Sequence, residues 1–458
     1  MKRYSVLSFM LATVIFAACK KEKDSGTPVI PPGEVSAADK VKDTVLMYSK
    51  DLYLWYKQIP TSFNARNYAD PNKIMEALRQ YSKEPGFTTP VDRWSFAYKQ
   101  TEWDDVSSGV AQDFGLNVFF YANGDLRVKS VEPRSPAGIA GIRRGWRIKS
   151  INGNTNITTS NSDFIVQNVF NSTTTAFSFE KADGSTVNLS LNAGTYQENP
   201  IYLDTVYTAG TKKVGYLVFN SFLGDTSQVY SDFQRIFNRF SQQQVSELIV
   251  DLRYNGGGYV SVQDKLANYL VPTNANGNVM MHQEFNDNYS DWNETSLFSK
   301  LGSVSVPRIF FIVSNSTASA SELLINNLKP YMDVKLVGPA ATYGKPVGFF
   351  PVPVGDWYIF PVSFRSTNKN GEGNYFQGLP LDKQVADGLN KDWGDQTESA
   401  LASALKFIET GSYSVVIPGE TIGAAGNTGY KEQAVIAGNK KLDEPAFKGT
   451  VDVRKRFK

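Results

Sequence analysis

The sequence predicts a layered α/β domain, preceded by a smaller β-rich domain and a short helical region. Strands alternate with helix-length apolar patterns after Lys213, which is typical of a layered α/β domain. Residues 108–193 instead carry short alternating strands separated by turns. With 458 residues, 41% of them hydrophobic and 20% charged, the chain can bury several cores. We therefore predict domains at 36–104, 108–193 and 205–408.

The composition excludes several classes of function. Lys and Arg number 47 against 45 Asp and Glu, so there is no basic excess of the kind that nucleic-acid binding requires. The single cysteine, Cys19, excludes an intramolecular disulfide and Cys-rich metal sites. The single histidine, His282, argues against a His-rich metal site and would have to serve any His-based triad. We expect no metal and no organic cofactor.

The N-terminus predicts export. Residues 1–18 carry Lys2 and Arg3 and continue into an apolar run that is shorter than the roughly 20 residues a bilayer span needs, so we interpret them as a removable signal peptide. The run ends at Cys19 and resembles a bacterial lipobox, although Phe16 replaces the usual leucine. This resemblance implies lipidation of Cys19, a tether over 19–35 and a membrane-anchored lipoprotein of the cell envelope, on its periplasmic side or at the cell surface. The alternative is an ordinary signal peptide with an incidental cysteine.

The helical region opens with two predicted helices. One begins at Ser36, a capping residue, and carries apolar residues on one face up to Trp55. The second begins at Asp70-Pro71, a cap followed by proline at the first helical position. We interpret the region 36–104 as a packing element without chemistry.

The β-rich region contains a run from Val131 to Asn154 in which a strand, a short helix, a glycine turn and a strand ending in Asn-Gly follow one another. This order resembles a PDZ domain. The resemblance implies that peptide carboxylates bind to the loop formed by Gly115, Leu116, Asn117 and Val118, with Asn117 in place of the family's second glycine. A PDZ-like module could also act only as a hinged regulator.

The α/β region is predicted to alternate strictly. Strands are expected at 213–219, 247–252, 308–313 and 335–338, with helices at 229–240, 261–270 and 320–328. The segment 409–458 is rich in Gly, Thr and Lys and has little apolar periodicity. We interpret it as peripheral.

Chemistry is expected where three of these strands end. Gly256–Gly258 follow a strand and precede a helix, so their N–H groups could hold an anion. The spacing of a nucleotide-binding P-loop is absent. A second strand runs into the cluster 314–324, where a serine at a helix N-terminus could act as a nucleophile or simply cap the helix. In a third segment Lys345 lies in a turn, and burial would let it act as a general base.

Together the runs DLRYNGGG, STASASE and TYGKP resemble the tail-specific, or C-terminal processing, serine peptidases from about Ser108 to Phe407. The resemblance implies a crotonase-like layered α/β fold and hydrolysis of peptide bonds in protein substrates through an acyl-enzyme. By motif position the nucleophile is Ser319 and the base Lys345, with an oxyanion hole formed by the N–H groups of Gly258 and Ala320. Ser316 and Ser321 are then structural.

One departure from the family matters. Many members carry glutamine four residues after the lysine, where this chain has Phe349. An apolar residue there would help to lower the pKa of Lys345 by desolvation, with Thr342 or a backbone carbonyl orienting the amine. The alternative is a non-catalytic, peptide-binding lipoprotein that keeps the fold.

Overall fold

The computed structural model describes residues 35–413, 431–442 and 447–453. The predicted signal peptide, Cys19 and nearly all of the predicted tether lie outside the described residues. Within them, no helix combines the length and the apolar character that crossing a membrane requires. The helices are α1 Ala37–Leu52, α2 Pro71–Leu78, α3 Gln100–Ser108, α4 Pro136–Ile139, α5 Ser162–Val169, α6 Thr226–Gln242, α7 Val260–Leu270, α8 Ala320–Leu328, α9 Ser399–Thr410 and α10 Lys431–Leu442.

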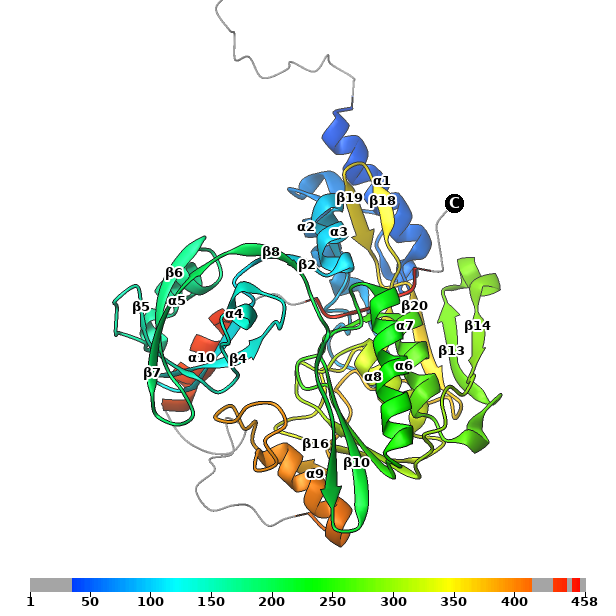
Figure 1. The fold of residues 1–458 in the computed structure, drawn as a ribbon. Helices are drawn as coiled ribbons and strands as arrows, with labels where there is room; N and C mark the ends of the chain where they lie inside the picture. Colours follow the sequence, from blue (N-terminus) through cyan, green and yellow to red (C-terminus); the bar gives the residue numbers. More distant parts are fainter. Residues whose placement is uncertain (1–34, 414–430, 443–446, 454–458) are drawn as a thin grey trace, which may run out of the picture.

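A six-stranded sheet forms the centre of the larger body (Figure 1). Its strands run in the order β21-β16-β15-β11-β10-β9, all parallel except for the antiparallel edge strand β9. Their bounds are β9 Ile201–Ala209, β10 Lys212–Phe219, β11 Glu247–Asp251, β15 Arg308–Ile312, β16 Asp333–Gly338 and β21 Lys383–Gln384. The predicted strands of the α/β domain are therefore confirmed in position, and the predicted helices correspond to α6, α7 and α8.

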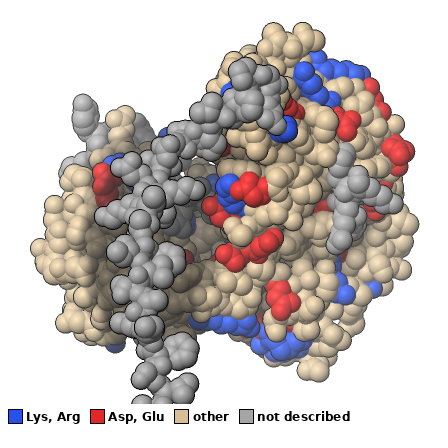
Figure 2. Space-filling view, turned by 90° about the horizontal axis from the view of Figure 1, so that it is seen from above, with Lys and Arg blue, Asp and Glu red and all other residues tan. Residues whose placement is uncertain are grey.

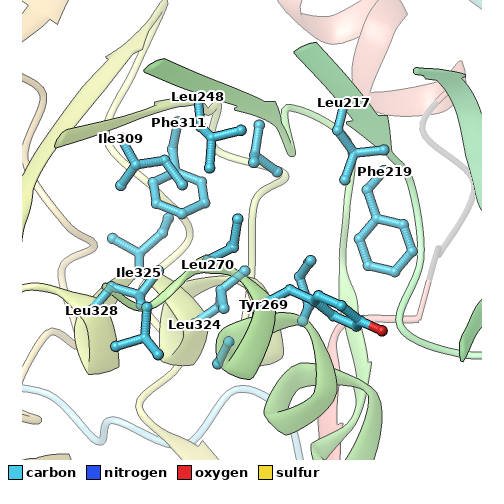
Figure 3. Packing of buried hydrophobic residues seen from close by; sticks show 14 of the residues in the cluster. Leu217, Phe219, Leu248, Tyr269, Leu270, Ile309, Phe311, Leu324, Ile325 and Leu328 are labelled. Carbon is cyan, nitrogen blue, oxygen red and sulfur yellow. The ribbon is translucent and has the colours of Figure 1, made fainter. Parts of the chain in front are cut away.

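Helices cover both faces of this sheet. On one face, side chains of α6, α7 and α8 pack against strand residues, as Leu324 and Leu270 do beside Leu248 and Phe311 (Figure 3). On the other face α9 packs its apolar side against β10, β11 and β15. The sheet is thus buried on both sides, as a mostly parallel sheet requires. The ends of its strands are held rigidly by these two cores, and the candidate site lies at those ends.

The N-terminal helices form as predicted. The Ser36 hydroxyl accepts the Asp39 N–H at the start of α1, and the Asp70 carboxylate caps α2. Sequence reasoning missed the strand β1 and the helix α3. β1 joins a three-stranded sheet with β19 and β18, which places the N-terminal region in one core with the segment around Phe349. The strands concerned are β1 Phe96–Lys99, β18 Val352–Val354 and β19 Trp357–Phe360.

A separate sheet of four strands, in the order β14-β13-β20-β17, lies beside this core. Its strands are β13 Val279–Phe285, β14 Glu294–Leu297, β17 Val347–Gly348 and β20 Phe364–Asn368. His282 lies within β13, and its Nδ1 pairs with the Thr295 hydroxyl at 2.8 Å. Sequence reasoning missed this strand.

The smaller body consists of a five-stranded antiparallel sheet with α4 and α5, hereafter the five-stranded module. Its strands, in the order β3-β4-β5-β6-β7, are β3 Leu116–Ala122, β4 Asp125–Val131, β5 Arg147–Ile151, β6 Thr174–Glu180 and β7 Thr186–Asn192. A two-stranded ladder of β2 Val110–Asp113 and β8 Gly194–Gln197 leads into and out of it. The predicted strand, short helix, glycine turn and Asn-Gly turn are all present. The last of these is a tight turn in which Asn152 and Gly153 both have positive φ.

The prediction that the segment 409–458 is peripheral is wrong for the parts that the structure describes. α10 packs on the five-stranded module, and Figure 1 shows it, in red, beside α5 and β4. Strand β22, Gly449–Val451, pairs in parallel with β12, Gly257–Tyr259, in the larger body. Low apolar periodicity concealed both elements, since the segment is held by backbone pairing and a few side chains.

Candidate active site

Ser319 lies in the turn between β15 and α8, as the Ser-rich motif predicted. It is fully buried, and its backbone adopts φ 61° and ψ −108°, outside the regions that non-glycine residues usually occupy. Such strain persists only where surrounding contacts impose it, and it is common at functional sites. Ser319 immediately precedes Ala320, the first residue of α8, so the dipole and free N–H groups of the helix favour negative charge beside it.

The glycine run approaches the same helix end. Gly257 and Gly258 have φ 105° and 141°, and a Cβ on Gly257 would lie 3.0 Å from the Ala320 nitrogen. A Cβ on Gly258 would lie 2.3 Å from the carbonyl carbon of Phe222, so only glycine fits. The side chain of Asn255 fixes the run by accepting the Gly257 N–H at 2.9 Å and donating to the Phe219 carbonyl. The structure thus brings the predicted oxyanion-hole segments together.

Lys345 is almost fully buried. Its Nζ lies 3.7 Å from the centroid of the Phe349 ring and 5.8 Å from that of Trp94, and donates to the Lys448 carbonyl at 3.0 Å. Burial holds the pKa of Lys345 well below its usual value, although the charges of Asp92 and Glu322 oppose this effect. The aromatic wall therefore has the desolvating character expected of Phe349.

Of the two groups expected to orient the lysine, a backbone carbonyl does so and Thr342 does not. The Thr342 hydroxyl donates to Glu322 Oε1 at 2.5 Å instead. The N-terminal region, interpreted as a packing element only, supplies Trp94 and Asp92 to the surroundings of this lysine. That interpretation was incomplete because the spacing of apolar residues does not show where a loop between helices folds back.

Glu322 is the residue of the site that sequence reasoning missed. Its Oε2 accepts the N–H groups of both Ser319, at 2.8 Å, and Lys345, at 2.9 Å, and its Oε1 accepts the Gly344 N–H. One fully buried carboxylate oxygen therefore fixes the backbones of the predicted nucleophile and the predicted base. Glutamate three residues after Ser319 is the signature of a capping box, and that signal could have revealed it.

The other serines of the motif have structural contacts. The Ser321 hydroxyl donates to the Asn255 carbonyl at 3.1 Å, and the Ser316 N–H donates to the Ser314 hydroxyl. These bonds tie the Ser-rich turn to the loop after β11. The Ser321 hydroxyl bond agrees with the structural role predicted for Ser321, whereas the Ser316 bond involves only the backbone of that residue.

A second ionic cluster, the Arg253 cluster, lies beside the glycine run. It consists of Asp251, Arg253, Asp387 and Glu398, with Arg144 of the five-stranded module completing it. Arg253 is 2% exposed and donates to all three carboxylates. Arg144 contacts Asp387 at 2.6 Å, so the cluster also connects the two bodies.

A cavity of about 910 Å³ extends between the two bodies. Its lining includes Gly115 and Asn117 on one side and Gly257 and Lys448 on the other. The segment predicted as a carboxylate-binding loop is a loop only at Gly115, because Leu116–Val118 form the start of β3 and pair with β4. This segment lines the same space as the glycine run. In Figure 2, which shows one face of the molecule, Lys and Arg lie among Asp and Glu rather than in one broad patch. Among the described residues, no group of three or more His, Cys, Asp or Glu could hold a metal ion.

Two sequence models of one family match the chain. The Peptidase family S41 model matches residues 213–382, and the Peptidase S41 N-terminal domain model matches residues 40–96. The second match extends the family resemblance beyond the span of Ser108 to Phe407 that the motifs indicated. It covers the region that contributes Trp94 to the site.

Individual relatives are distant. The carboxy-terminal processing protease CtpB of Bacillus subtilis (strain 168) is 24% identical over 319 residues, covering 68% of this chain and 62% of that protein. A CtpA-like serine protease of Staphylococcus epidermidis is 25% identical over 262 residues, covering 56% of this chain and 49% of the relative. The chain thus spans less than two thirds of the length of these relatives.

The fold also has a solved counterpart. The crystal structure of an S41 protease from Bacteroides fragilis superposes with a TM-score of 0.66 at 22% identity, covering 80% of this chain and 96% of the other. This similarity supports the mixed α/β fold with its β-rich sheets. Both family models match in order and fall on elements that build the site, so residues 40–96 and 213–382 carry the sequence pattern of peptidase family S41, and the chain is similar to the C-terminal processing proteases.

Proposed function

We propose that the chain is a serine endopeptidase that hydrolyses peptide bonds in protein substrates, unfolded or presented by their tails. Ser319 is the nucleophile and Lys345 the general base. The observation that carries this proposal is the shared contact of both residues with Glu322 Oε2, which fixes a strained serine and a desolvated lysine next to one another.

The chemistry follows from these environments. A neutral Lys345 takes the proton of the Ser319 hydroxyl as the serine oxygen attacks the scissile carbonyl carbon. The resulting oxyanion is held by the N–H groups of Gly258 and Ala320, at the positive end of α8. Lys345 then protonates the leaving amine, and water hydrolyses the acyl-enzyme by the same route in reverse.

The five-stranded module has a place in this proposal. Its segment Gly115–Val118, which includes the start of β3, opens into the cavity that reaches the glycine run, and the order of its elements resembles a PDZ domain. We propose that Gly115, Leu116, Asn117 and Val118 receive the carboxylate end of a substrate.

The dyad is tested by Ser319→Ala and Lys345→Ala, assayed on an unfolded protein such as casein. Each change should lower turnover by about 10³-fold or more, and the double variant should lose little more, because the two residues act as one unit. A fluorophosphonate should label the parent at Ser319 only. Near-normal turnover by Lys345→Ala would contradict the assignment, provided that thermal unfolding shows an intact fold. If the folded parent protein neither reacts with the fluorophosphonate nor hydrolyses casein, the alternative holds. The chain would then be a non-catalytic, peptide-binding protein, as the replacement of glutamine by Phe349 suggested.

We further propose that the protein is exported and anchored through lipid on Cys19. The support is the apolar run that ends at Cys19, together with the balanced charge of the remaining chain. Cys19→Ser should abolish labelling with a fatty acid and release the protein from membranes. Retention of the Cys19→Ser protein after a high-salt wash would refute the anchor.

A further inference from the structure

The C-terminal strand β22 lies directly beside Ser319 and Lys345. It pairs in parallel with β12, with Gly449 opposite Gly257 and Thr450 opposite Gly258. Its other edge is also paired, since the Phe349 N–H donates to the Thr450 carbonyl and the Asp452 N–H donates to the Phe349 carbonyl, both at 3.0 Å. The strand is therefore held between the predicted oxyanion segment and the wall of the lysine pocket.

The contacts of β22 engage both residues of the proposed dyad. The Thr450 hydroxyl lies 2.5 Å from Ser319 Oγ, and the Lys448 carbonyl accepts the Lys345 amine. In the described part of the chain Ser319 and Lys345 share no hydrogen bond, because each is bonded to this segment. A Cβ on Gly257 would lie 2.4 Å from the Gly449 carbonyl oxygen, so that oxygen points toward the glycine run.

Helix α10, which precedes β22 in the chain, docks on the five-stranded module. The Asn439 side chain accepts the Phe120 N–H at 2.7 Å and donates to the Phe120 carbonyl at 3.0 Å. Phe120 belongs to β3, the edge strand of the five-stranded sheet, so the amide side chain of Asn439 completes hydrogen bonds that an added strand would otherwise make. Leu442 is buried in the core of the module.

We propose that α10 and the segment 447–453 form an intramolecular inhibitor, with β22 filling the substrate groove and α10 docking on the edge strand β3. The blocking role rests on the proposed peptidase function, whereas occupancy of the groove does not. A protein segment that adds to β12 and to the edge of β3 competes with this inhibitor, and its binding opens the site. Substrates are therefore extended segments with a small residue at the position that Gly449 occupies, because a Cβ there would lie 2.8 Å from the Phe349 ring.

The test uses the full chain with Gly449→Val, which suits a strand but whose Cβ would lie 2.2 Å from the Phe447 ring and 2.8 Å from the Phe349 ring. Thr450→Ala, which removes the hydroxyl at Ser319 together with one methyl group, is the second variant. Ile436→Ala is the matched control, because Ile436 is 49% exposed on α10. Two readouts are compared: hydrogen exchange of the Phe349 and Asp452 amides, which needs no catalysis, and the rate of fluorophosphonate labelling at Ser319.

We expect the Phe349 and Asp452 amides to be protected in the parent and in Ile436→Ala, and to exchange about tenfold faster or more in Gly449→Val. Labelling should rise by about tenfold in Gly449→Val and less in Thr450→Ala. Unprotected amides in the parent would overturn the inference and leave the peptidase proposal intact. If the two amides exchange faster in Gly449→Val but Ser319 is labelled in none of the proteins, β22 does occupy the groove and the peptidase proposal is wrong. Release of Thr450–Lys458 from the parent on incubation would show a substrate rather than an inhibitor.

Discussion

Two buried ionic groupings lie on either side of the glycine run, and they differ in how completely their charges are matched. In the Arg253 cluster each charge has opposite partners, and two arginines with Tyr254 hold the pKa of Asp387 well below its usual value despite its burial. Around Lys345 the amine donates to one carbonyl and faces two aromatic rings, and burial lowers its pKa against the opposing charges of Asp92 and Glu322, neither of which accepts a hydrogen bond from the amine. The first grouping keeps its charges, whereas the second favours a neutral amine.

This difference separates a structural role from a reactive one. Fully paired buried charges have little tendency to change protonation, so they fix geometry. A desolvated lysine next to a strained serine has a free-energy reason to lose its proton, which a general base requires. Arg253 and Lys345 are both buried, so burial alone does not separate a structural role from a reactive one. The groups that surround each side chain do.

The largest effect on stability is expected from Arg253→Met. It leaves three carboxylates without their shared cation, and breaking a buried ion pair by removing one partner costs about 3–5 kcal/mol. The control is Arg66→Met, whose ion pair with Asp43 is 43% and 45% exposed and should contribute far less, because water screens it. Urea denaturation gives both values. Equal losses in the two variants would contradict the view that the Arg253 cluster is structural.

A smaller effect, on catalysis more than on folding, is expected from Glu322→Gln. In either orientation the amide presents an NH₂ group to two donors that the carboxylate oxygen had accepted. The Ser319 and Lys345 backbones should shift apart, and turnover should fall by about 100-fold, as for a displacement of about 1 Å. The measurement is kcat on casein beside the unfolding midpoint. Normal kcat in a folded Glu322→Gln protein would remove Glu322 from the positioning of the dyad.

Local signals predicted the elements of the site well. The positions of β15, α8 and the glycine run follow from apolar runs, capping residues and three consecutive glycines, each of which acts within a few residues. The capping glutamate Glu322 was within reach of the same reasoning. The positions of Ser319 and Lys345 came from motifs, and the structure brings their backbones onto one carboxylate oxygen.

Contacts between distant segments could not be predicted in this way. β22 pairs through its backbone, so neither composition nor periodicity marks it, and Trp94 reaches Lys345 from a loop whose path depends on the β1–β19 pairing. Arg144 joins the Arg253 cluster from the other body. These features depend on tertiary packing, which a window of neighbouring residues does not contain.

The finest test of the comparison is the pH dependence of the lysine pocket. Only the neutral amine of Lys345 can accept the Ser319 proton, so the labelling rate should rise about tenfold per pH unit and then level off at the folded-state pKa of this residue. Because burial lowers that pKa, the plateau should begin well below the ordinary value of 10.5.

The free energy of unfolding should follow the same titration. Between the folded-state and unfolded-state pKa values the unfolded chain binds more protons, so this lysine makes the free energy of unfolding rise with pH across that window. Lys345→Met should remove this contribution and be the more stable protein below the window, whereas Arg253→Met should leave it unchanged. A labelling rate that levels off only near pH 10.5, or a Lys345→Met protein with the same pH dependence of stability as the parent, would place the lysine in water-like surroundings and erase the contrast with the Arg253 cluster.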